Sequence, residues 1–160
     1  MFLGLSLVTA CGGDDAPTVD APRSDGPTTP DGGIDADPAT CTSFTFTMSG
    51  AEEVPPVDTP ATGNGTVTMD TATNTLTYNI TFTGLSAAET GAHIHGFADI
   101  GADGGVLFSL PAGSPKVGMV TFQENDQADL LAGLSYVNVH SGNNPGGEIR
   151  GQVDGGVPCP

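Results

Sequence analysis

The chain has 160 residues, with 24 glycines, 13 prolines and only three Lys and Arg against 19 Asp and Glu, which gives a net charge of −16. Nucleic-acid binding needs clustered basic side chains that meet the phosphates, so this balance excludes nucleic acid as a partner, and it excludes an electrostatic grip on anionic lipid. A net charge so far from zero favours solubility.

Residues 1–10 are predicted to be a lipoprotein signal segment. The run from Phe2 to Ala10 is apolar and small, and it ends in Val8-Thr9-Ala10-Cys11. This order fits the cleavage pattern of bacterial lipoproteins, in which the cysteine is lipidated. The run is too short to span a bilayer, which takes about 20 residues. No Lys or Arg precedes it, and a buried apolar N-terminus is the alternative. Cys11 is therefore the predicted lipidation site, with the membrane as a partner.

Residues 11–40 are expected to form a disordered, acidic tether. They are rich in Asp, Pro, Gly and Thr, and Val19 and Ile34 are their only large apolar residues. Such a segment buries too little apolar surface to offset the entropy lost on ordering. Behind a lipidated cysteine it would hold a domain away from a membrane. We expect a lipid anchor in the cell envelope, at the outer membrane or cell surface, facing the periplasm or the exterior.

Cys41 and Cys159 remain once Cys11 is assigned to lipid, and they bound a predicted domain at 41–160. An even pair of cysteines in an exported protein predicts a disulfide. Closing a loop of this length stabilises a fold by roughly 4–5 kcal/mol in the chain-entropy picture. Two free thiols or a two-cysteine metal site are the alternatives.

Apolar and polar residues alternate along most of 41–160, which is typical of half-buried antiparallel strands. The apolar members of the clearest runs are Phe44, Phe46, Met48, Leu76, Tyr78, Ile80, Phe82, Val106, Phe108 and Leu110. Strands are expected near 43–49, 64–69, 75–83, 90–96, 105–110, 116–122, 134–140 and 147–153. Turn residues separate them at short intervals, as in a sandwich or barrel. A short helix is predicted over 124–133, with Asn125 or Asp126 capping its start and Gly133 its end.

Two loops carry acidic residues. Glu52, Glu53 and Asp58 flank a Pro-Pro pair, and we expect their carboxylates to be exposed. The segment 99–104 resembles the front of a calcium loop, but Leu110 stands where a bidentate Glu is required, so we expect a hairpin loop. A looser calcium site with Asp99 and Asp103 is the alternative. Since the sequence also lacks a Gly-x-Ser-x-Gly motif, an enzyme is not expected.

All three histidines fall in two of the predicted strands. Alternate side chains of a strand share a face, so His93 and His95 point the same way, and His140 shares its face with Tyr136 and Asn138. If the two faces meet, three imidazoles could bind copper or zinc and leave one position open, provided that their nitrogens lie within about 5 Å. The alternative is a structural cluster, in which the rings hydrogen-bond to the backbone, Tyr136 or Glu148 and keep the strands in register.

Four neighbours could support such a centre. Tyr136 and Asn138 could orient the rings. Glu148 and Arg150 alternate with Ile149, which places them on one strand face, where they could take part in an ion pair. Arg150 could also attract an anion to a bound metal.

The motifs from 43 to 153 resemble the CHRD (chordin-type) domain, a module of many exported proteins. The matching pieces are Gly50-Ala51-Glu52-Glu53-Val54-Pro55-Pro56-Val57, Gly63-Asn64-Gly65, Leu76-Thr77-Tyr78-Asn79-Ile80, Gly84-Leu85, Ala92-His93-Ile94-His95-Gly96, Tyr136-Val137-Asn138-Val139-His140 and Asn144-Pro145-Gly146-Gly147-Glu148-Ile149-Arg150-Gly151-Gln152. The resemblance implies a β-sandwich that acts as a binding or structural module for an unidentified protein or small ligand.

A weaker likeness concerns the segment from Gly84 to His95, which resembles the copper-binding strand of Cu/Zn superoxide dismutases, also β-sandwiches. It implies that His93, His95 and, more loosely, His140 bind copper, and that Arg150 guides an anion. The chain departs from those enzymes because it has no fourth histidine and no zinc loop. The alternative function is thus a copper or zinc protein, redox-active if it works like a dismutase. The predicted fold is an all-β, antiparallel Ig-like or superoxide-dismutase-like β-sandwich with one short helix and a disordered N-terminal tether.

Overall fold

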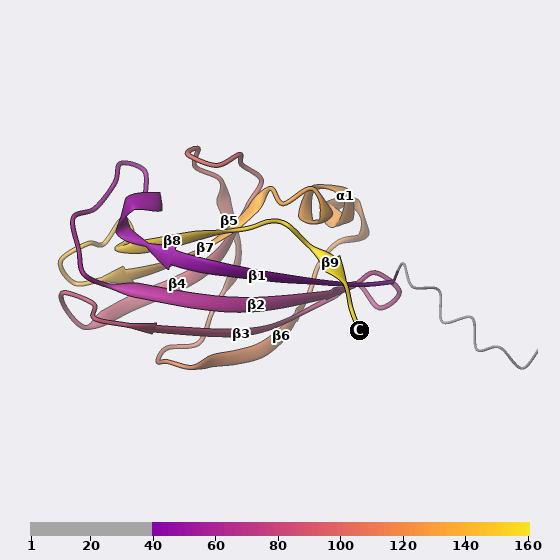
Figure 1. Cartoon of the computed structure of the whole chain (residues 1–160), viewed down its shortest axis with the longest axis horizontal. Coiled ribbons are helices and arrows are strands. Elements are labelled where there is room, and N and C mark those ends of the chain that lie inside the picture. The colour runs from indigo at the N-terminus through magenta and orange to yellow at the C-terminus, as the bar shows by residue number, and fades with distance from the viewer. Residues whose placement is uncertain (1–39) are drawn as a thin grey trace, which may run out of the picture. The chain divides into compact units, whose positions relative to one another are not determined.

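The computed structural model describes residues 40–160 (Figure 1). The predicted signal segment, Cys11 and nearly all of the predicted tether lie outside these residues. The strands are β1 (Cys41–Ser49), β2 (Thr62–Asp70), β3 (Thr75–Thr83), β4 (Glu89–Gly96), β5 (Gly105–Ser109), β6 (Lys116–Thr121), β7 (Ser135–Ser141), β8 (Ile149–Val153) and β9 (Val157–Pro158). The helical segments are η1 (Gly50–Glu52), η2 (Glu124–Asp126) and α1 (Gln127–Leu131). Within 40–160, none of the helices is long and apolar enough to cross a bilayer.

The strands form one antiparallel sheet in the order β5-β4-β7-β8-β1-β2-β3-β6, with β9 beside β1. The pairing of β1 with β8 consists of a single residue pair, Ser49 with Arg150. This narrow connection divides the sheet into a half with β5, β4, β7 and β8 and a half with β1, β2, β3, β6 and the short β9. Figure 1 shows β1, β2 and β3 running side by side in the second half. The predicted all-β antiparallel sandwich with one short helix is confirmed.

The core lies between the two halves because the alternating apolar residues of each half turn toward it. Its buried members are Phe44, Phe46, Met48, Val67, Met69, Leu76, Tyr78 and Ile80 from one half and Ala92, Ile94, Val137, Val139, Ile149 and Val153 from the other. Exposed threonines and asparagine alternate with them on β1 and β3, as the sequence predicts.

The strand β5 departs from its predicted pattern. The register between β4 and β5 shifts at a bulge between Ile94 and His95, so that Phe108 opposes Ile94 while Val106 opposes His95. A shift of one residue exchanges the two faces of a strand. Val106 was predicted to lie on the apolar face, but the shift leaves it 54% exposed.

The predicted helix over 124–133 is shorter than expected. The chain forms a 3₁₀ turn first and then α1, which ends before Gly133. Gly133 has a φ of +77°, and its N–H donates to the Leu130 carbonyl at 3.1 Å, so the predicted C-terminal glycine is confirmed. Asp126 precedes α1, but its side chain makes no capping hydrogen bond.

A buried ion pair joins β6 of one half to β4 of the other. The Lys116 ammonium group on β6 is fully buried and donates to the Glu89 carboxylate of β4 and to the Pro111 carbonyl. It also lies 5.1 Å from the centroid of the Phe82 ring. A buried charge is tolerated only when it is paired and hydrogen-bonded, and Lys116 meets both conditions.

The two ends of the described region are joined covalently. Cys41 and Cys159 form the predicted disulfide, with their Cα atoms 5.4 Å apart and a separation of 118 positions in the sequence. Backbone hydrogen bonds also join the two ends, since the N–H of Cys159 donates to the carbonyl of Cys41 at 3.1 Å and β9 pairs with β1.

Candidate metal centre

Three neighbouring strands present a polar face on the side away from the core. The apolar residues of β4, β7 and β8 point inward, so the alternate positions lie together on the opposite face. This polar face consists of His93, His95, Tyr136, Asn138, His140, Arg150 and Gln152. Loop 97–104, between β4 and β5, covers part of it, since its carbonyl oxygens accept hydrogen bonds from four of these side chains. Nearly all of β7 and all of β8 are therefore buried.

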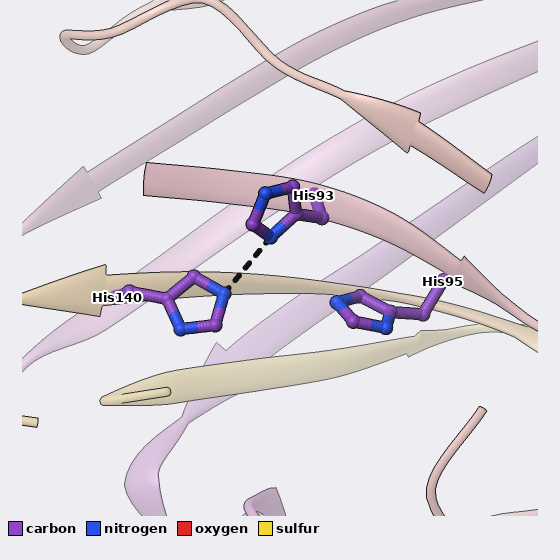
Figure 2. Close-up of side chains that lie close together, drawn as sticks. All are labelled: His93, His95 and His140. Carbon is purple, nitrogen blue, oxygen red and sulfur yellow. Dashed lines mark hydrogen bonds between the residues drawn. The ribbon is translucent and has the colours of Figure 1, made fainter. Parts of the chain in front are cut away.

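The three histidines meet on this face. His93 and His95 come from β4, His140 comes from β7, and Figure 2 shows their rings turned toward one another. One nitrogen from each ring lies within 4.8 Å of the others. The closest pair is His93 Nδ1 and His140 Nε2, at 2.9 Å. These nitrogen–nitrogen distances are below the limit of about 5 Å that three ligands of one ion must meet.

The spacing of the nitrogens is close to that of a coordination sphere. With metal–nitrogen bonds of about 2.0–2.1 Å, neighbouring nitrogens of a tetrahedral site lie about 3.3 Å apart. The observed separations extend from 2.9 Å to at most 4.8 Å, on either side of that value.

Two backbone carbonyls determine the tautomers of His95 and His140. The Gly104 carbonyl lies 3.0 Å from His95 Nδ1, and the Pro145 carbonyl lies 3.0 Å from His140 Nδ1. A carbonyl only accepts, so each Nδ1 carries the proton and each Nε2 carries a lone pair. His140 Nε2 accepts from His93, whereas His95 Nε2 is buried and has no partner among residues 40–160. These two lone pairs have the orientation that metal-binding histidines obtain from a backbone partner.

The surroundings favour neutral rings. Burial lowers the pKa of His93 below its ordinary value, and the nearby His140 and His95 rings add to this effect. Burial also lowers the pKa of His140, although the hydrogen bond to Pro145 opposes the change. A histidine must be neutral to bind a metal, so both shifts favour a ligand role at neutral pH.

Tyr136 and Arg150 stack next to the histidine cluster. The Tyr136 ring stacks on His95, with centroids 4.7 Å apart and planes 8° from parallel. The Arg150 guanidinium carbon lies 3.4 Å from the centroid of the same Tyr136 ring. The side chain of Tyr136 thus holds the His95 ring in place by stacking, a support that was predicted from the shared strand face.

The predicted anion-guiding role of Arg150 is wrong. An anion would have to reach the guanidinium group, but Arg150 is 1% exposed. Its nitrogens donate to the Ala102 carbonyl at 2.7 Å and to the Asp103 carboxylate at 3.3 Å. Loop 97–104 therefore covers Arg150, which serves to hold that loop on the polar face.

The prediction that Glu148 shares a strand face with Arg150 is also wrong. The strand β8 begins only at Ile149, after Gly147 at a φ of +139°, so strict alternation does not extend back to Glu148. Its carboxylate accepts hydrogen bonds from Thr59 Oγ1 at 2.7 Å and from the Ser86 N–H and hydroxyl at 2.7 and 2.9 Å. Glu148 therefore joins the chain segments at Thr59 and Ser86 through hydrogen bonds. Arg150 forms its ion pair with Asp103 instead.

Asn138 lies beside the histidines without bonding to them. It is 3% exposed, and the register places it opposite His93 on one side and opposite Arg150 on the other. Its Oδ1 is buried and finds no hydrogen-bond donor in the described part of the chain. The predicted role of Asn138 in orienting a ring therefore has no hydrogen bond to support it.

Glu53 is a buried acidic residue that the sequence analysis placed on the surface. It is 7% exposed, whereas Glu52 is exposed as expected. Burial raises the pKa of Glu53 to about 7, although the positive charge of Arg150 opposes the rise. Its Oε1 has no partner within residues 40–160, and a Cβ atom at Gly147 would collide with its carboxylate. No local signal marks this residue, since Glu52 and Val54 on either side are exposed.

Comparison with known proteins agrees with the fold. The model of the CHRD domain family matches residues 44–153. Chordin of Xenopus laevis is 34% identical over 116 residues, which cover 66% of this chain and 12% of that protein. The chain thus spans only about an eighth of the length of that relative. No solved structure matches it.

Proposed function

The chain belongs to the CHRD domain family, and from this premise we propose that it is an exported binding module whose site is a mononuclear copper or zinc centre formed by His93, His95 and His140. The disulfide between Cys41 and Cys159 supports export, because disulfides persist in oxidising compartments. The proposed activity is the binding of a metal ion, with no catalytic step.

One observation carries the metal centre. The two Nε2 lone pairs of His95 and His140 are fixed by carbonyl partners on the far side of each ring, and His93 completes a set within 4.8 Å. Imidazole suits copper and zinc, and three neutral imidazoles leave one position open. His93 must give up its hydrogen bond to His140 Nε2 when the ion enters, because that bond occupies the space between them.

Calorimetric titration of the purified protein with Zn²⁺ and Cu²⁺ tests the proposal. We expect one ion per chain with a sub-micromolar Kd. His95→Ala should abolish this binding, because among the three histidines His95 has the Nε2 lone pair that is buried and without a partner in residues 40–160. Mg²⁺ serves as the control cation, since it measures attraction to the net charge of −16 without using imidazole.

Two results would contradict the metal centre. One is the absence of Zn²⁺ and Cu²⁺ binding in the wild-type protein. The other is binding that persists in His95→Ala while its thermal unfolding is unchanged, because the ions would then be held elsewhere.

We also propose that the domain is attached to a membrane through a lipid on Cys11. The order Val8-Thr9-Ala10-Cys11 supports this, and the Asp-rich residues 11–40 would provide the spacer. The protein expressed in a Gram-negative bacterium should enter the detergent phase on Triton X-114 partition, and Cys11→Ala should stay in the aqueous phase. A wild-type protein that stays in the aqueous phase would argue against the anchor.

A further inference from the structure

We propose that Asn138 is part of the metal centre: its Oδ1 accepts a hydrogen bond from the water molecule that fills the open position of the bound ion. This inference rests on the proposed three-histidine centre and adds a fourth polar group to it. The residue would position the bound water without binding the ion itself.

The place of Asn138 in the sheet supports this role. On β7 it lies directly opposite His93 of β4, and its neighbours on the same face of β7 are Tyr136 and His140. Side chains that oppose one another on neighbouring strands have Cβ atoms about 4.5–5.5 Å apart. Asn138 thus lies beside two of the three proposed ligands, His93 and His140.

The carboxamide lacks the hydrogen bond that its burial requires. Asn138 is 3% exposed, yet its Oδ1 accepts no hydrogen bond from any group in residues 40–160. A buried acceptor without a donor destabilises a fold, and native structures rarely contain one without a bound water or ion that explains it.

The hydrogen bonds of the nearby donors go to other acceptors. The Arg150 guanidinium donates to Ala102, Asp103 and Gln152. The Tyr136 hydroxyl and the Gly104 backbone bond to each other. None of these bonds reaches Oδ1, so in this arrangement its donor comes from outside residues 40–160.

A second unsatisfied atom lies on the same face. His95 Nε2 is buried and carries a lone pair without a partner in the described region. One bound ion with its water satisfies both atoms, because the ion accepts the imidazole lone pair and its water donates to Oδ1. A three-histidine site keeps such a water, and the ion makes it a stronger donor.

The variant Asn138→Leu tests the inference through two measurements of opposite sign. Leu has a similar volume and removes the unsatisfied polar group, so the metal-free variant should unfold a few degrees higher than the wild type. The same change removes the partner of the bound water, so the Kd for Zn²⁺ should rise by about tenfold or more. Asn138→Asp keeps an acceptor at this position and adds a negative charge near the ion, so its Kd should not rise above that of the wild type.

Each contrary result has its own meaning. If metal-free Asn138→Leu unfolds at a lower temperature than the wild type, Asn138 has a structural role and the inference is wrong. If the variant binds Zn²⁺ as tightly as the wild type, the water contact is wrong while the three-histidine centre stands. A wild-type protein that binds no Zn²⁺ overturns the centre itself, and this inference with it.

Discussion

Glu53 and Glu148 are both buried, yet the pKa values of their carboxyl groups differ in opposite directions from the ordinary value of 4.5. Burial by itself raises the pKa of each. At Glu148, hydrogen bonds from Ser141, Thr59 and Ser86 outweigh burial and bring the pKa down to about 2. At Glu53, no such set of donors is present among residues 40–160, and the pKa rises to about 7.

The raised pKa of Glu53 makes stability depend on pH. The unfolded chain releases the Glu53 proton near pH 4.5, whereas the folded protein holds it until about pH 7. The contribution of Glu53 to stability is therefore present in full below pH 4.5 and is lost as the pH rises toward 7. A pKa difference of this size corresponds to about 3 kcal/mol.

Glu53→Gln should remove this dependence, because the amide stays neutral. We expect the free energy of unfolding of the variant, relative to the wild type, to grow by about 3 kcal/mol between pH 4.5 and pH 8. Urea denaturation of both proteins across this range measures the difference. Glu124→Gln, at an exposed position of η2, is the matched control. A difference between Glu53→Gln and wild type that stays constant with pH would mean that Glu53 is not buried as a neutral acid.

At the scale of single residues, the strand faces that carry the histidines could be predicted from the sequence, whereas the positions of Arg150 and Glu148 could not. The period of two places His93 and His95 on one face of β4 and His140 on one face of β7. The pairing of β4 with β7, which brings these faces together, is a finding of the structure. The burial of Arg150 depends on loop 97–104, and the direction of Glu148 depends on the backbone at Gly147. Neither follows from alternation, because both are set by contacts between segments far apart in the sequence.

At the scale of the elements, most strands follow directly from the sequence. The bounds of all eight predicted strands, β1 to β8, lie within two residues of their predicted positions, whereas the two-residue β9 was not predicted. The bulge beside His95 was not predicted, because no residue of β4 or β5 requires it locally. The short η1 was also missed, since its three residues are too few to show a helical period.

The Lys116–Glu89 pair links two strands that are not neighbours in the sheet. Replacing one partner leaves the other charge buried alone, which typically costs about 3–5 kcal/mol. We expect Lys116→Met and Glu89→Gln each to lower the free energy of unfolding by about 3 kcal/mol. The double variant should lose clearly less than the total of the two, because neither charge is then left without its partner.

Urea unfolding of the four proteins gives the coupling between the two sites. Met119→Gln, at a position of β6 that is 64% exposed, is the control on the same strand and should change stability by less than about 0.5 kcal/mol. Losses that simply add in the double variant would show that the pair does not couple the two halves.

At the scale of the whole described domain, the core, the ion pair and the disulfide act on different parts of the sandwich. The core holds the two halves together, while Lys116 and Glu89 link β6 to β4. The disulfide between Cys41 and Cys159 closes a loop of nearly the entire domain, which in the chain-entropy picture stabilises it by roughly 4–5 kcal/mol. The pairing of cysteines could be predicted from their number and positions, because only two remained after Cys11.

The same disulfide limits the effect of a single proteolytic cleavage. Every loop of the sandwich lies between Cys41 and Cys159, so a single cut in any of them leaves two pieces that are still one covalent molecule. The fragments cannot diffuse apart, and the strands of each half can pair again after the cut. An exported domain built in this way survives isolated cleavage as an assembled unit until the bond is reduced.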